Sequence, residues 1–215
     1  MLKVLTAAIL LIPGNLAAQP PQPLGQPVIL VRSYDRLAMA EEFAVTRSHV
    51  EDILRQTGIG VSWLECGADS LPPDTLPAAC QQPLRANEFI VRVVSAVDEN
   101  AAIHRESLGY SLIDASTRGG SVAKVYADRI AALAGQADVN RLDLLARAIA
   151  HEIGHLLTGS NTHSRQGLMR ALWTTTELRR NLRRDWRFSW VQAETMRQTL
   201  VTAALVAGDA VVARH

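Results

Sequence analysis

Two histidines and a glutamate in the second half of the chain have the spacing of a metal site. His151, Glu152 and His155 belong to the sequence His-Glu-Ile-Gly-His. On a helix, residues four apart lie on one face, so His151 and His155 can bind one cation together. Neutral imidazole suits Zn²⁺, and Glu152 lies beside the pair, where it can accept a proton from water. The pattern is typical of zinc hydrolases and predicts that chemistry here.

The same pattern also occurs on the exposed polar face of ordinary helices. Apolar residues surround this motif on both sides and favour the metal site: Leu142, Leu144, Leu145, Ala148, Ile149, Ile153, Leu156 and Leu157. A helix with this composition is expected to be largely buried. Buried imidazole and carboxylate groups need polar partners, and a metal ion would supply one.

A zinc site needs at least a third protein ligand. Gly159 can end the helix in a left-handed turn, and a short polar loop then leads to His163. Met169 follows in a Gly-Leu-Met turn. We predict that His163 completes the site, so that three histidines hold one catalytic Zn²⁺ and leave one position for water.

The order of these residues resembles the metzincin clan of zinc proteases. That clan has His-Glu-x-x-His-x-x-Gly-x-x-His and a downstream Met-turn under the metal. This chain departs from the pattern, because Thr158 occupies the place of the glycine and His163 follows His155 by eight residues rather than six. The alternative third ligand is a carboxylate from a later helix, as in the thermolysin-like gluzincins. Glu177 and Glu194 are the candidates.

The chain before the motif predicts alternating strands and helices. Apolar runs and alternating patterns predict strands, and apolar residues three or four apart predict helices. The predicted strands span 28–31, 59–63, 89–94, 108–113 and 121–126, and the predicted helices span 38–56 and 128–134. This order resembles the amino-terminal subdomain of metzincins. The resemblance implies an α/β (α+β) fold, with a twisted, mainly parallel mixed sheet packed on the active-site helix and a small helical carboxy-terminal subdomain.

The resemblance also implies where a substrate would lie. In metzincins an edge strand of the sheet lines the cleft and pairs with an extended peptide, because a strand edge offers unpaired backbone groups. Segments 108–113 and 121–126 are the candidates for this strand, and an ordinary core hairpin is the alternative. By the same resemblance, residues 170–173 would form a wall of the pocket.

Two helices are predicted after the Met-turn. Thr174 can cap a helix that contains Glu177, Leu178 and Leu182. Ser189 starts the last helix, which is expected to pack behind the helix that carries the histidines.

The first residues predict export. A charged start, a short apolar run over 4–12 and a small-residue end describe a signal peptide at 1–18. The apolar run is too short for a membrane span, and an uncleaved anchor is the alternative. A Pro/Gln-rich leader is expected at 19–27 and a single domain at 28–215, with a carboxy-terminal subdomain over 160–215. The protein is then secreted or periplasmic.

The two cysteines agree with export. Cys66 and Cys80 can form a disulfide in an oxidising compartment and close a loop of about 15 residues. Free thiols or metal ligands are the alternatives, although the spacing fits no usual zinc pattern. The formal net charge of +1 gives no indication of a nucleic-acid partner or an anionic membrane.

These observations predict a secreted zinc-dependent endopeptidase that acts on peptide or protein substrates. Glu152 is the predicted general base, which takes a proton from water and returns it to the leaving amine. The chain has no tyrosine after Tyr126, so the tyrosine that some metzincins place after the Met-turn is absent. The alternatives are a zinc hydrolase of non-peptide amides or esters and a non-catalytic zinc-binding scaffold.

Overall fold

The computed structural model describes residues 25–35, 40–67, 75–97, 107–114 and 116–212. The predicted signal peptide and most of the leader lie outside the described residues.

A five-stranded mixed sheet forms the centre of the fold. Its strands are β1 (Val28–Asp35), β2 (Gly60–Gly67), β3 (Glu88–Val94), β4 (Gly109–Ile113) and β5 (Gly120–Tyr126), in the spatial order β2-β1-β3-β5-β4. The pairs β1–β2, β1–β3 and β3–β5 are parallel, and β4 runs antiparallel to β5. This confirms the mainly parallel mixed sheet, and it makes β4 an edge strand.

The central strands have one mainly apolar face, which packs against the helices, whereas their other face also carries charged side chains such as Arg32 and Glu88. Ile29 and Val31 of β1 and Val91 and Val93 of β3 have no exposed surface. Their side chains belong to one core with residues from the helices.

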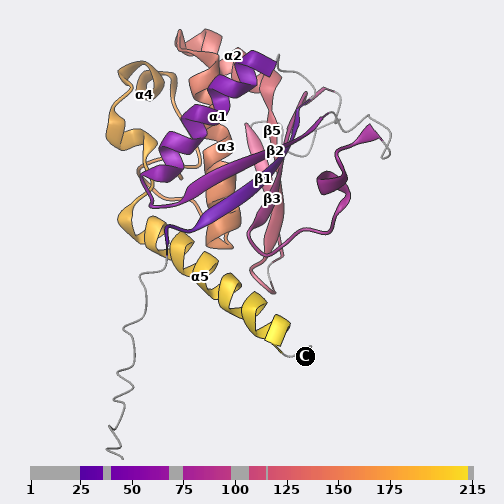
Figure 1. The fold of residues 1–215 in the computed structure, drawn as a ribbon. Helices are drawn as coiled ribbons and strands as arrows, with labels where there is room; N and C mark the ends of the chain where they lie inside the picture. The colour runs from indigo at the N-terminus through magenta and orange to yellow at the C-terminus, as the bar shows by residue number, and fades with distance from the viewer. Residues whose placement is uncertain (1–24, 36–39, 68–74, 98–106, 115, 213–215) are drawn as a thin grey trace, which may run out of the picture.

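One of the helices contacts most of the other elements of the fold. The helices are α1 (Ala40–Arg55), α2 (Ala127–Ala137), α3 (Arg141–Thr158), α4 (Thr175–Arg180) and α5 (Trp190–Val212). α3 contacts α1, α2, α5 and the strands β3, β4 and β5. Figure 1 shows α3 in orange in the middle of the molecule and α5 in yellow below it. The predicted packing of the last helix behind α3 is confirmed.

The two helices after the Met-turn differ slightly from their predicted bounds, because α4 ends earlier and α5 begins later. α4 has the predicted cap, because Thr174 and Glu177 form a capping box. It ends at Arg180, so Leu182 lies outside it, because Asn181 adopts a left-handed conformation with φ 46°. α5 begins at Trp190, one residue after the predicted start. Within the described part of the chain, α5 and the other helices all lack the length or the apolar composition needed to cross a membrane.

A disulfide fixes the segment after β2 to the sheet. The Sγ atoms of Cys66 and Cys80 are 1.99 Å apart, and Cys80 lies in the short 3₁₀ helix η2 (Ala78–Gln81). Beneath this segment, the buried Arg32 pairs with Glu88 and donates to the carbonyl oxygen of Gln82 at 2.6 Å. The guanidinium therefore replaces hydrogen bonds that the segment's carbonyl groups would otherwise make with water.

Candidate metal centre

Specific residues define both ends of α3. Asn140 caps the start, where its side-chain oxygen accepts from the amides of Leu142 at 2.8 Å and Asp143 at 3.3 Å. Gly159 ends the helix with φ +59°. A Cβ at Gly159 would collide with the carbonyl oxygen of Arg118, so a glycine is required there for both reasons. The chain then turns back and can return along the helix.

Three histidines meet at this end of α3. The ligand atoms of His151, His155 and His163 all lie within 4.8 Å of one another. This is the only group of three or more potential ligands of this kind among the described residues. The first two side chains are buried and the third is exposed. The eight-residue spacing of His163 from His155 therefore still brings the three imidazoles together.

The hydrogen bonds of the two buried histidines fit a metal ion between them. Nδ1 of His151 lies 2.9 Å from the carbonyl oxygen of Leu168, and Nδ1 of His155 lies 2.7 Å from that of Ser160. A carbonyl only accepts, so each Nδ1 carries the proton and each Nε2 is left with a lone pair. The two Nε2 atoms are 3.0 Å apart. Two zinc-bound imidazole nitrogens in tetrahedral geometry lie roughly 3.3 Å apart, so the donor set fits Zn²⁺.

The surroundings keep these imidazoles neutral. Burial lowers the pKa of His151 to about 3, although its hydrogen bond with Leu168 opposes the shift. Burial also lowers the pKa of His155 and of His163. Neutral imidazole is the form that binds a metal, so the metal-free site is ready to bind at neutral pH.

Glu152 is buried beside the histidines and is held by the edge strand. The hydroxyl of Ser111 donates to Oε2 of Glu152, at 2.7 Å, and lies 2.9 Å from its carbonyl oxygen. Burial raises the pKa of Glu152 to about 7, and the hydrogen bond from Ser111 opposes this shift. A carboxyl group with a pKa near neutrality can both take and give a proton at neutral pH. Ser111 could not be identified from the sequence, because it reaches Glu152 only through the packing of β4 on α3.

The Met-turn lies directly under α3. Met169 is buried, and a Cβ at Gly154 would lie 2.8 Å from its Sδ atom. The same Cβ would lie 2.5 Å from Cε1 of Phe188. Gly154, inside the motif, is therefore the residue that allows the Met-turn and Phe188 to approach the helix. This packing role of Gly154 was not apparent from the sequence.

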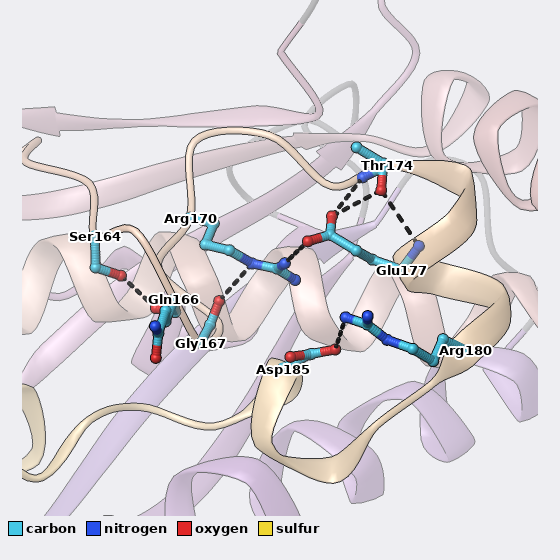
Figure 2. Close-up of polar contacts among 8 residues, drawn as sticks. All are labelled: Ser164, Gln166, Gly167, Arg170, Thr174, Glu177, Arg180 and Asp185. Atoms are coloured by element: carbon cyan, nitrogen blue, oxygen red, sulfur yellow. Dashed lines mark hydrogen bonds and ion pairs between the residues drawn. The ribbon is translucent and has the colours of Figure 1, made fainter.

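The two alternative ligands are engaged elsewhere. Glu177 pairs with Arg170, and its Oε2 accepts from the amide of Thr174 at 3.0 Å and from its hydroxyl at 2.8 Å (Figure 2). These hydrogen bonds from Thr174 and the nearby Arg170 guanidinium lower the pKa of Glu177. Glu194 pairs with Arg197 on α5 at 2.5 Å. Neither carboxylate belongs to the three-histidine group.

The histidines and Glu152 open into a cleft of about 780 Å³. Residues 107–113, which include β4, form one wall, and residues 170–173 form another, as the resemblance implied. Residues of α2 such as Leu133 line the cleft beyond the histidines. Leu112 is 55% exposed and Leu172 is 73% exposed, so each presents an apolar side chain at the cleft.

Comparison with solved structures identifies the fold. Archaemetzincin from Methanopyrus kandleri is similar over 84% of this chain and 99% of its own, with a TM-score of 0.51 and 14% sequence identity. No family model matches the sequence, and no curated protein sequence matches it. The chain therefore has a metzincin-like fold, similar to that of archaemetzincin. At 14% identity the similarity concerns the fold alone, and the three-histidine cluster is the separate observation that a metal ion could bind here.

Proposed function

We propose that this protein is a zinc-dependent endopeptidase. The observation that carries the proposal is the approach of the Nε2 atoms of His151 and His155 to 3.0 Å, while each Nδ1 contacts a backbone carbonyl oxygen. His163 would be the third ligand and Glu152 the general base. When bound, Zn²⁺ would polarise the carbonyl of the substrate and lower the pKa of a water molecule.

The residues of the chain supply the proton transfers and the substrate geometry. Glu152 accepts the proton of the attacking water and returns it to the leaving amine. Ser111 holds Oε2 of Glu152 in place for both transfers. Among the described strands β4 pairs with β5 alone, so its other edge can pair with an extended peptide that passes the histidines. This arrangement favours a peptide or protein as the substrate.

The proposal includes export of the protein. It assigns residues 1–18 to a signal peptide, 19–27 to a leader and 28–215 to one peptidase domain, divided near residue 160. The disulfide between Cys66 and Cys80 supports an oxidising compartment, which is the periplasm or the exterior of the cell.

Zinc content and turnover of the purified protein test the proposal. We expect about one zinc per chain and chelator-sensitive cleavage of a peptide mixture. His163→Ala should bind zinc more weakly, because it removes a ligand. Glu152→Gln should keep the zinc and lose turnover by about 10²–10⁴-fold, because it removes the general base. Glu194→Gln, which alters a carboxylate on α5, is the matched control and should leave both unchanged.

Three outcomes would contradict this assignment. A wild-type chain without zinc, even after reconstitution, would exclude the metal site. Undiminished turnover in Glu152→Gln would exclude the mechanism. Hydrolysis of small esters or amides without cleavage of any peptide would replace the substrate class with the non-peptide alternative.

A further inference from the structure

The Met-turn loop (residues 164–174) contacts the histidine ligands directly. The carbonyl oxygen of Leu168 accepts from Nδ1 of His151 at 2.9 Å. Trp173 lies edge-on to the imidazole of His151, with ring centroids 5.7 Å apart. The loop also begins immediately after His163, whose ring centroid is 5.3 Å from that of His151. The conformation of this loop therefore determines how two of the three imidazoles are oriented.

One arginine connects the turn at Gly167 to the end of this loop at Thr174 (Figure 2). Nε of Arg170 donates to the carbonyl oxygen of Gly167 at 3.0 Å, and Nη1 pairs with Oε1 of Glu177. The other carboxylate oxygen of Glu177 accepts from the amide and the hydroxyl of Thr174. Gly167 and Thr174 are thus linked through a single ion pair.

The arginine of this ion pair is buried, and the glutamate is partly exposed. The side chain of Arg170 is 9% exposed, and that of Glu177 is 25% exposed. The Arg170 guanidinium lies over the ring of Trp186, 5.4 Å from its centroid, and Trp186 packs against Trp173. Nη2 of Arg170 is buried without a hydrogen-bond partner. A buried cation with one carboxylate partner depends strongly on it, because removal of either member leaves an uncompensated charge.

We propose that Arg170 and Glu177 are positioning residues of the three-histidine site. They hold the Met-turn loop so that the Leu168 carbonyl and Trp173 fix the orientation of His151. Groups that orient metal ligands commonly change metal affinity by about 10-fold to 100-fold when they are removed. This inference rests on the proposed zinc site.

A second ion pair nearby provides a matched control. Arg180 and Asp185 are 2.9 Å apart in the same region of the molecule (Figure 2). The side chain of Arg180 is 48% exposed. Its hydrogen-bond partner, Asp185, belongs to the segment after α4 rather than to the Met-turn loop. The charge of Arg180 contributes less than that of Arg170 to the low pKa of Glu177, so its removal should leave the Arg170–Glu177 pair and the histidines in place.

The test measures zinc affinity by competition with a chelator, and the visible spectrum of the Co²⁺-substituted protein. We expect Arg170→Met and Glu177→Gln to weaken zinc binding about 10-fold to 100-fold and to shift the Co²⁺ absorption bands. The double variant should bind no more weakly than the weaker single variant, because both changes break the same link. Arg170→Lys keeps the charge but not the fork geometry, so it should recover part of the loss. Arg180→Met should match the wild type.

Thermal unfolding of the metal-free variants separates affinity from folding, and Arg170→Lys serves if Arg170→Met does not fold. Wild-type affinity and spectrum in folded variants of Arg170 and Glu177 would overturn the inference alone. Tighter binding in Arg170→Met would also overturn it, because a freed Glu177 would then be acting as a ligand. A wild-type chain that binds neither metal would overturn the proposed function and, with it, this inference.

Discussion

At the scale of single residues, Gly154 determines how closely the chain can approach the helix that carries His151 and His155. Its missing side chain leaves space that Met169 and Phe188 fill from below. Protein interiors are packed so closely that an added methyl group must displace such neighbours. The backbone of α3 at the motif therefore meets the Met-turn directly.

We expect Gly154→Ala to lower the free energy of unfolding by about 1–3 kcal/mol, because the new methyl group overlaps Phe188 and Met169. Gly135→Ala, in α2, is the control. No atom lies within 4 Å of a Cβ there, so it should instead raise the stability by about 0.5–1 kcal/mol. Urea unfolding of the metal-free proteins measures both, and equal stability of Gly154→Ala and the wild type would contradict the close packing.

Contacts between residues on one helix could be predicted from the sequence, whereas contacts that depend on tertiary packing could not. His151 and His155 could be paired because helical geometry alone puts residues four apart on one face. Ser111 reaches Glu152 from a strand 41 positions away, through packing that no local pattern encodes. Arg170 and Glu177 are close in sequence, but their pairing depends on the path of the Met-turn loop.

At the scale of elements, the sequence could not show which of the segments 108–113 and 121–126 forms the edge strand of the sheet. The segments that became β4 and β5 are both short and partly apolar, and either fits an edge strand. The choice depends on β5 pairing in parallel with β3, which leaves β4 at the border of the sheet. Helix α4 shows a similar limit, because its end depends on the left-handed conformation of Asn181.

A carboxylate at the start of α2 should make the stability of the fold depend on pH. The Asp128 carboxylate accepts from the amide of Ala96 and the hydroxyl of Ser95, both at 3.0 Å, and so ties the chain after β3 to α2. Burial raises the pKa of Asp128, but these hydrogen bonds outweigh that effect and hold the pKa below its ordinary value of 3.8. The ionised carboxylate thus stabilises the fold above pH 3.8, and this contribution is lost as the pH falls through the pKa of the folded protein.

We expect Asp128→Asn to cost about 1 kcal/mol at pH 7 and less at a pH below the folded pKa. Chemical unfolding at several pH values measures the difference, and NMR titration of the wild type gives the carboxyl pKa directly. A variant that is destabilised equally at all pH values would show that the charge of Asp128 has no part in this contact.

At the scale of the whole molecule, the disulfide and the metal centre lie at opposite borders of the sheet. Cys66 belongs to β2 at one edge, and Ser111 belongs to β4 at the other. Cys66 and Cys80 also form a small apolar cluster with Tyr34, separate from the main core. Stability and metal binding should therefore respond independently to changes at the two borders.

The double variant Cys66→Ser/Cys80→Ser should lose about 3 kcal/mol of unfolding free energy, the value that the chain-entropy model gives for a loop of this size. Its zinc affinity should equal that of the wild type, because the cleft lies at the far edge. Denaturant unfolding and chelator competition on the same sample test the two statements, and a large fall in zinc affinity would show that the borders are coupled.

The unequal burial of the three histidines implies an order of events when the metal is exchanged. His151 and His155 are buried on a rigid helix and held by the Leu168 and Ser160 carbonyls, whereas His163 is exposed on a loop. Exposed side chains change rotamer within picoseconds to nanoseconds, so His163 is the ligand that can detach first. We expect the off-rate of zinc to be set at the loop, and stopped-flow transfer of the metal to a chelator from wild type and His163→Ala would record it.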